Sequence, residues 1–383
     1  MHVVLDFNPA LRERFSGFWT YGQGLLGGLL ADSRVEQATL LCWQGALDAA
    51  RDFTFRDHPK VRLLPVSVKL RWWERLWLVS PWPSLQQLCG QFDVYHSFHH
   101  LMPPSRGTPR VLTVHDLRQY RMPELYPGCR KWGFERAVRR ADRIIAYSDW
   151  TARDLMEILR VPAQKVDVVP LATTGSFAQA SPQQAQRTRQ WLSSRMHAPV
   201  GRYALAIGSP DRRKNLAGVV RAFALARPRL PDDFRLVLAG NVDPGENLPS
   251  LLASGGIADS VLLTGPLGQE ELHDVMASAD VFVFLSLYEG FGLPLLEAMS
   301  AGVPVISSNR SAMPEVVGDA GRLVDPLDAA AVAEELVHVC TEPTLRGGLA
   351  ASGLRRAKEF TWTRTAAGTV ECYLRAIQAC RQG

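Results

Sequence analysis

Short apolar segments alternate with stretches of helical periodicity along almost the whole chain. These segments are rich in Val, Ile and Leu, which is typical of strands buried on both faces of a sheet. The expected strands are 3–7, 39–42, 61–66, 94–96, 111–114, 143–146 and 166–169, followed by 203–207, 235–239, 261–264, 281–285 and 303–307. Because strands alternate with helices, the pattern predicts an α/β protein with parallel sheets covered by helices on both faces.

The alternation is interrupted between residues 173 and 201, where Ser, Thr, Gln, Ala and Pro predominate. Part of this stretch can form a helix, but the next strong strand begins only at Tyr203. A chain of 383 residues is long for one core and suits two domains of about 150–200 residues each. We therefore expect two Rossmann-like parallel-sheet domains, 1–176 and 177–362.

The composition is that of a globular protein, with 46% hydrophobic and 21% charged residues. No apolar run approaches the roughly 20 residues that span a bilayer, and the first residues do not resemble a signal peptide. The six cysteines are scattered without a CxxC pair, which favours reduced thiols and a cytoplasmic location.

The net charge of +5 is unevenly distributed. Residues 1–176 hold 23 Lys and Arg against 17 Asp and Glu, whereas the remainder holds 20 against 21. A basic first half indicates an anionic partner such as a lipid phosphate, a membrane surface or nucleic acid, or simply a solvated surface. No nucleic-acid-binding module is recognised, so we expect no nucleic-acid partner.

The segment 286–299 carries the clearest chemical pattern and follows the expected strand 281–285. Gly290 and Gly292 permit a sharp turn and close approach of a ligand, and Pro294 suits the first turn of a helix. Such a helix start favours an anion such as a diphosphate. Glu289 and Glu297 are poor phosphate ligands but good acceptors for ribose and sugar hydroxyls. The alternative is an ordinary strand–turn–helix with surface glutamates.

A second segment, 208–216, follows the expected strand 203–207 and contains Arg213 and Lys214. The chain has only six lysines against 37 arginines, so Lys214 does not reflect a general lysine content. Cations held at a strand end can stabilise the charge of a leaving diphosphate. The alternative is a solvated basic loop.

The run from Glu289 to Glu297, Glu-Gly-Phe-Gly-Leu-Pro-Leu-Leu-Glu, resembles the signature of the GT-B retaining glycosyltransferases of family 4. Segments 114–117, 146–151, 208–216, 311–316 and 321–324 resemble the same family. The resemblance is strongest over 203–325 and weak over 40–90. It implies two domains that face each other across a cleft, an N-terminal acceptor domain and a C-terminal donor domain, with the helix 363–383 packed back on the first.

The resemblance also implies a donor site for a sugar nucleotide. Its expected members are Gly17, Gly208, Arg213, Lys214, Gly265, Leu267, Glu289, Gly290, Phe291, Gly292, Leu293 and Glu297, and its expected catalytic residues are His115, Glu289, Arg213 and Lys214. In the family's arrangement Glu297 binds the ribose, Glu289 the donor sugar, and His115 faces that sugar.

Other members of this set have expected places as well. Gly265 and Leu267 would lie beside the base, and Gly17 in a loop near the diphosphate. The bulky Phe18 and Trp19 after Gly17, and Ser209 where many members carry arginine, depart from the family pattern.

The implied reaction retains the anomeric configuration and requires no metal ion or other cofactor. The sequence contains no Asp-x-Asp, the carboxylate motif that holds Mg²⁺ or Mn²⁺ in metal-dependent glycosyltransferases. Analogy with bacterial mannosyltransferases of the family favours GDP-mannose as the donor. A rhamnosyl- or glucosyltransferase that uses a dTDP- or UDP-sugar, and a non-catalytic sugar-nucleotide-binding protein, remain as alternatives.

The segment 69–78 interleaves Trp72, Trp73 and Trp77 with Lys and Arg, as in helices that lie at a membrane interface. A second basic cluster comprises Arg130, Lys131, Arg136, Arg139, Arg140 and Arg143. Both features favour a polyprenyl-diphosphate-linked saccharide acceptor and peripheral contact with the inner membrane. The alternative is a tryptophan-rich core helix.

The segment 22–27 matches the dinucleotide-binding pattern GxGxxG, but it does not directly follow the first strand. We expect it to form a helix whose small residues permit close packing, not a dinucleotide site.

Overall fold

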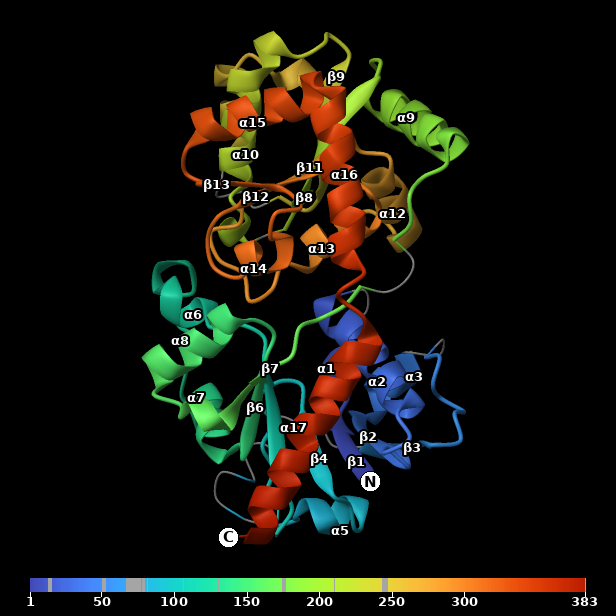
Figure 1. Cartoon of the computed structure of the whole chain (residues 1–383), viewed down its shortest axis with the longest axis vertical. Helices are drawn as coiled ribbons and strands as arrows, with labels where there is room; N and C mark the ends of the chain where they lie inside the picture. Colours follow the sequence, from blue (N-terminus) through green and yellow to red (C-terminus); the bar gives the residue numbers. More distant parts are fainter. Residues whose placement is uncertain are drawn as a thin grey trace. The chain divides into compact units, whose positions relative to one another are not determined.

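The structure is a computed structural model that describes residues 1–12, 16–49, 53–66, 77, 80, 82–105, 107–129, 131–173, 177–209, 211–242 and 247–382. Internal contacts divide the chain into two units, Met1–Ala172 with Phe360–Gly383, and Thr173–Glu359 (Figure 1). The division falls a few residues before the expected boundary at 176, and the C-terminal helix belongs to the first unit.

The first unit is built on a seven-stranded parallel sheet with the order β3-β2-β1-β4-β5-β6-β7. Its strands are β1 (His2–Asp6), β2 (Gln37–Trp43), β3 (Val61–Val66), β4 (Val94–Ser97), β5 (Arg110–Val114), β6 (Arg143–Ala146) and β7 (Val166–Val168). The helices are α1 (Asn8–Arg12), α2 (Gly17–Ala31), α3 (Gln44–Ala49), α5 (Leu85–Cys89), α6 (Arg118–Arg121), α7 (Lys131–Arg140), α8 (Asp149–Leu159) and α17 (Trp362–Gln382).

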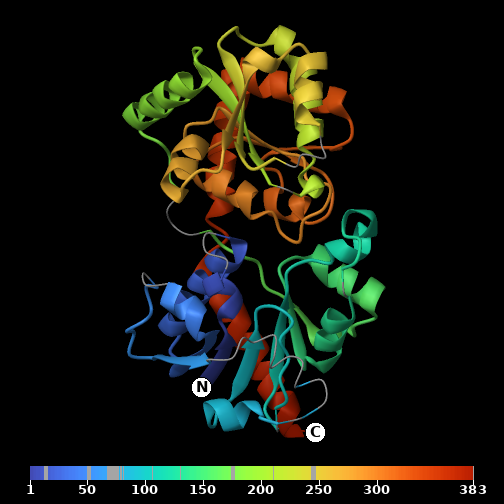
Figure 2. The ribbon, with the colours of Figure 1, turned by 180° about the vertical axis from the view of Figure 1, so that it is seen from behind.

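The helix α17 packs on α2 in this unit (Figure 2). A Cβ atom added at Gly24 would come within 1.9 Å of the Trp362 ring, so only glycine permits this approach. The predicted GxGxxG segment therefore lies inside a helix and serves close packing, as expected. Further along α17, the Tyr373 hydroxyl lies 2.6 Å from Nδ1 of the buried His96, which ties the helix to β4.

The second unit is built on a six-stranded parallel sheet with the order β10-β9-β8-β11-β12-β13. Its strands are β8 (Arg202–Gly208), β9 (Phe234–Gly240), β10 (Val261–Gly265), β11 (Val281–Phe284), β12 (Val305–Ser308) and β13 (Arg322–Val324). The helices are α9 (Pro182–Met196), α10 (Leu216–Ala226), α11 (Leu248–Ser254), α12 (Gln269–Ala277), α13 (Leu293–Ser300), α14 (Met313–Val317), α15 (Ala329–Thr341) and α16 (Pro343–Ala357).

In this sheet the strand order reverses between β8 and β11, which makes that point the topological switch where α/β sheets bind ligands. The predicted class of two Rossmann-like parallel sheets is confirmed, and every predicted strand is present with bounds within two residues. The short edge strand β13 was not predicted because three residues beginning with Arg322 carry too little apolar pattern.

Trp77 corrects one expectation about the tryptophan-rich segment. Its side chain is buried, with 4% of its surface exposed, and its indole N–H donates to the carbonyl of Pro83 at 2.9 Å. The prediction that Trp77 contacts a membrane is therefore wrong, because its ring belongs to the core. Trp72 and Trp73 lie outside the described residues. Over the described part of the chain, no helix has both the length and the apolar character needed to cross a bilayer.

Candidate functional site

Two loops meet at the switch point of the second sheet, one after β8 and one after β11. The backbone N–H of Leu287 donates to the carbonyl of Arg213 at 2.8 Å. Asn215, in a left-handed conformation with φ 54°, donates from its amide to the carbonyls of Leu285 and Pro326 at 3.3 and 2.9 Å. The two loops are thereby joined, so charged residues far apart in the sequence lie together.

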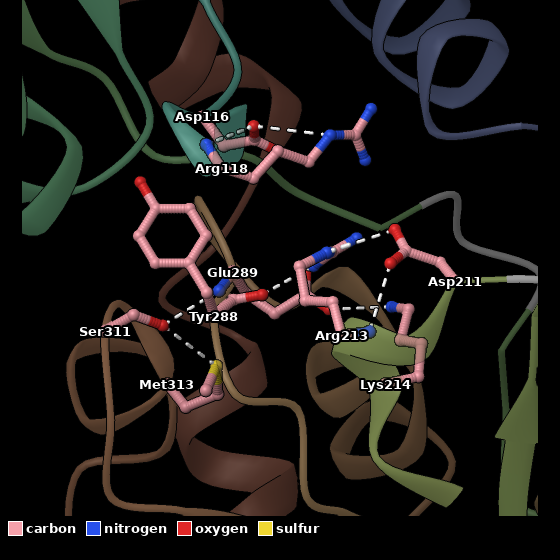
Figure 3. A network of polar contacts seen from close by, with 9 residues as sticks. All are labelled: Asp116, Arg118, Asp211, Arg213, Lys214, Tyr288, Glu289, Ser311 and Met313. Carbon is pink, nitrogen blue, oxygen red and sulfur yellow. Dashed lines mark hydrogen bonds and ion pairs between the residues drawn. The ribbon is translucent and has the colours of Figure 1, made fainter. Parts of the chain in front are cut away.

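Arg213, Lys214 and Glu289 form a buried ion cluster at this junction (Figure 3). Arg213 Nη1 lies 2.6 Å from Glu289 Oε2, and Lys214 Nζ lies 2.7 Å from Glu289 Oε1. The Arg213 side chain is only 6% exposed, whereas that of Lys214 is 15% exposed. Lys214 is thus the more accessible cation, and Arg213 mainly holds the carboxylate and the β11 loop.

Burial by itself raises the pKa of the Glu289 carboxyl, but the charges and hydrogen bonds of Arg213 and Lys214 outweigh it and lower the pKa to about 2. Glu289 is therefore ionised at neutral pH. A carboxylate oxygen has two lone pairs, so each can accept one hydrogen bond from a cation and another from a ligand hydroxyl.

Three neighbours that were not singled out from the sequence hold this cluster in place. Asp211 Oδ2 lies 3.2 Å from Arg213 Nε, and the carbonyl of Tyr288 accepts from Arg213 Nη1 at 2.6 Å. The hydroxyl of Ser311 accepts from the Glu289 backbone N–H at 2.9 Å. Asp211 and Ser311 fall inside segments that the family resemblance covers, but their contacts depend on loops brought together by the fold.

Glu297 lies in α13, which follows directly from the Glu289 loop. Gly292 occupies the N-cap with φ 106°, a conformation that side chains rarely adopt, and Pro294 stands in the first turn as predicted. Glu297 is half-buried, and no described residue donates a hydrogen bond to its carboxylate. Burial raises its pKa to about 7, with the charge of Lys214 acting in the opposite direction. The carboxylate is available for a ligand donor.

The remaining candidates of this unit surround the same sheet edge. Gly208 ends β8, where an added Cβ would come within 2.5 Å of the Asn241 carbonyl, and Gly265 ends β10 with φ 69°. Leu267 is half-buried just before α12. Gly290, Phe291 and Leu293 complete the turn between β11 and α13, with Phe291 buried.

His115 and Gly17 belong to the first unit. His115 follows β5, and its Nε2 lies 2.6 Å from the carbonyl of Phe98. Burial lowers the pKa of His115 to about 4, so the imidazole is neutral at pH 7. Because Nε2 must carry the proton to donate, Nδ1 is left as an acceptor. The ring packs against Phe18 at a centroid distance of 4.3 Å, and Gly17 begins α2.

Two family models match the chain, one in each unit. The model for Glycosyltransferase Family 4 matches residues 37–173, and the model for glycosyl transferases of group 1 matches residues 201–342.

Curated relatives agree with these models. The O-antigen chain mannosyltransferase B of Escherichia coli is 31% identical over 285 residues, which cover 73% of this chain and 74% of the relative. The MMP alpha-(1->4)-mannosyltransferase of Mycolicibacterium hassiacum is 34% identical over 311 residues, covering 75% and 72%.

Solved structures show the same fold at lower identity. Sucrose-phosphate synthase from Thermosynechococcus elongatus superposes with a TM-score of 0.73 at 18% identity, covering 99% of this chain and 100% of that protein. The Anabaena protein HepE, solved with UDP and glucose, gives a TM-score of 0.69 at 18% identity, covering 97% and 98%. Fold, sequence motifs and relatives agree that the chain belongs to glycosyltransferase family 4 and is a hexosyltransferase.

Proposed function

We propose that this glycosyltransferase moves mannose from GDP-mannose to a lipid-linked saccharide acceptor in the assembly of a cell-surface polysaccharide. The observation that carries the proposal is the ion cluster of Arg213, Lys214 and Glu289 at the switch point, with Glu297 on the helix that follows, whose carboxylate receives no hydrogen bond from a described residue. Mannose is favoured because relatives covered over about three quarters of their length are named mannosyltransferases.

The proposed reaction needs no metal ion, because the cations of the cluster would balance the charge of the leaving diphosphate, and it retains the anomeric configuration, as the family resemblance implies. The acceptor hydroxyl would attack the anomeric carbon from the face that the diphosphate leaves. The bond from that carbon to the phosphate oxygen breaks, and the departing oxygen takes the proton of the acceptor. Lys214, supported by Arg213, would stabilise the charge that develops on the diphosphate, and His115 and Glu289 would contact the donor sugar. The first turn of α13 would supply backbone N–H groups to the diphosphate.

Calorimetric titration with GDP, UDP and dTDP in the presence of EDTA tests the donor site. We expect micromolar binding of GDP, and Glu297→Gln should weaken it about 10- to 100-fold, since hydrogen bonds to a charged group contribute about 1.5–3 kcal/mol. Preference for UDP or dTDP would indicate that the donor sugar is a hexose other than mannose. If no nucleotide binds, the donor site is not where we place it, and a role other than sugar transfer at this cluster must be sought.

The same titration at several pH values tests Glu297 itself. Because the ribose hydroxyls donate hydrogen bonds, the ionised carboxylate is the binding form. Its pKa of about 7 means that binding below pH 7 must release a proton, so affinity should rise with pH and level off above 7. In Glu297→Gln, nucleotide affinity should lack the rise with pH that comes from this carboxyl. Ionisation of the nucleotide phosphates affects both proteins equally. Parallel profiles would contradict the ribose contact.

The acceptor side of the proposal includes peripheral contact with the cytoplasmic face of the inner membrane through α7. This helix carries Lys131, Arg136, Arg139 and Arg140, and its Trp132 is 54% exposed. The guanidinium of Arg136 lies 5.4 Å from the centroid of the Trp132 ring. An exposed indole among arginines is suited to anionic headgroups.

Sedimentation with vesicles tests this contact. The vesicles consist of phosphatidylcholine with about one third phosphatidylglycerol, which gives them an anionic surface. The double variant Trp132→Ala/Arg139→Glu should lose several-fold in the bound fraction at low salt. The control Leu225→Ala removes a 55% exposed side chain from the other unit and should bind as the wild type does. Equal binding of both variants would exclude α7 as the contact.

A further inference from the structure

A groove of about 550 Å³ runs between α9 and α12 in the second unit. These helices pack side by side at one edge of the sheet (Figures 1 and 2). The wall from α9 and its N-cap consists of Ser181, Gln183, Gln184, Arg187, Thr188 and Trp191, and the wall from α12 of Glu271, Asp274 and Val275. None of these residues belongs to the expected donor site.

A hydrogen bond joins the two walls, from the side-chain amide of Gln184 on α9 to Asp274 Oδ1 on α12. Two further contacts fix side chains within α9: the hydroxyl of Thr188 donates to the carbonyl of Gln184 at 3.0 Å, and the guanidinium of Arg195 lies 4.9 Å from the centroid of the Trp191 ring. The groove is therefore formed in the absence of any ligand.

The side chains that line the groove indicate what it can bind. The lining residues include two carboxylates, Glu271 and Asp274, and one cation, Arg187, so their net charge disfavours an anionic ligand such as a nucleotide. A purely apolar ligand would remove water from the carboxylate lone pairs that Gln184 and the Gly268 backbone do not occupy, which is unfavourable. A neutral polyhydroxylated ligand satisfies both requirements, because its hydroxyls donate to carboxylates and accept from amides and guanidinium. The indole of Trp191 provides an apolar surface for the C–H face of a sugar ring.

The groove lies apart from the switch point. Arg195 donates to the carbonyl of Thr264 at 3.0 Å, which places α9 against β10, the edge strand of the sheet. Lys214 and Glu289 follow β8 and β11, two and three strands further in, and neighbouring strands are about 4.8 Å apart. The volume falls within the roughly 300–1,000 Å³ typical of small-ligand sites.

We propose that this groove is a second saccharide-binding site, which holds a neutral oligosaccharide segment of the acceptor chain away from the reacting end. The proposal rests on the proposed function, which supplies a growing saccharide. A saccharide segment bound in this groove would keep a long acceptor attached to the second unit between successive transfers.

Calorimetry and native electrophoresis through gels containing soluble α-mannan test the groove without any donor. Linear neutral manno-oligosaccharides should bind the wild-type protein, and saturating GDP should not displace them. Trp191→Ala should weaken binding at least tenfold, and Gln183→Ala about fivefold. The matched control is Gln186→Ala, an exposed glutamine of the same helix that does not line the groove.

The outcomes separate this proposal from the proposed function. If oligosaccharides do not bind, or if Gln183→Ala and Gln186→Ala bind equally well, the groove is not a saccharide site, whatever the nucleotide titration shows. Displacement by GDP would assign the saccharide to the donor site instead. Should Trp191→Ala fail to fold, as judged by circular dichroism, the pair of glutamine variants still decides. In transfer assays, Gln183→Ala should raise KM for a long acceptor and leave KM for a monosaccharide acceptor unchanged.

Discussion

Lys214→Met is expected to lower the rate of sugar transfer about 100- to 1,000-fold, the usual effect of removing one group that stabilises transition-state charge. Lys214 is the accessible cation of the buried cluster, and methionine keeps its length but not its charge. Glu289 would still be paired with Arg213, so the fold should persist. The measurement is release of nucleoside diphosphate from the donor that the titration selects.

Arg212→Met is the matched control for this prediction. Arg212 lies two residues before Lys214 in the same loop and is exposed, and the structure describes no ion pair between it and the cluster. Its replacement should change the rate by no more than about twofold, since exposed charges contribute little. If both variants lose activity equally, general electrostatic attraction of the donor and not the position of Lys214 would explain the loss.

Glu289→Ala is expected to lower the free energy of unfolding by about 3 kcal/mol, because it removes the buried carboxylate shared by Arg213 and Lys214 and leaves Asp211 as the remaining carboxylate beside Arg213. The change should appear as a lower urea midpoint for the unit that contains this site. Glu270→Ala removes an exposed glutamate from α12 and should have little effect. Combining Glu289→Ala with Lys214→Met should restore part of the loss, since one unpaired cation is removed. An unchanged midpoint for Glu289→Ala would mean that the ion cluster does not stabilise the domain.

The pH dependence of unfolding provides an independent check on Glu289. Its pKa is lowered in the folded protein from 4.5 to about 2, so its stabilisation is fully present above pH 4.5 and is lost as the pH falls toward 2. The difference corresponds to roughly 3 kcal/mol, at about 1.4 kcal/mol per pKa unit. The stability curves of the wild-type protein and Glu289→Ala should therefore converge in acid. Curves that remain parallel would show that the carboxylate is not ionised within the cluster.

Local sequence patterns predicted the fold class and the elements that carry the site. Buried parallel strands are continuous apolar runs, so the strands that precede the Lys214 and Glu289 loops could be recognised without their partners. Gly292 and Pro294 likewise indicated the turn and helix start before Glu297, because both residues restrict the backbone locally. The short β13 could not be predicted, since its pairing with β12 depends on the whole sheet.

The assignment of roles to individual side chains depended on the tertiary structure. Lys214 and Glu289 are 75 residues apart in sequence, and only the adjacent positions of β8 and β11 bring them within 2.7 Å. Trp77 is an example in which the sequence pattern allowed two interpretations. Interleaved tryptophan and basic residues are compatible with a membrane surface or with a core, and the burial of the Trp77 ring shows that it belongs to the core.

The sequence by itself therefore determined the two-domain α/β fold and which loops carry the charged residues, because secondary structure and turn chemistry are encoded over a few neighbouring residues. The resemblance of its motifs to family 4, and not these local patterns, indicated sugar transfer. The tertiary structure decided that Glu289 is ion-paired while Glu297 has no ion-pair partner among the described residues, and that α9 and α12 enclose a groove. Burial and long-range electrostatic contacts set these properties, and both arise only when distant segments pack together.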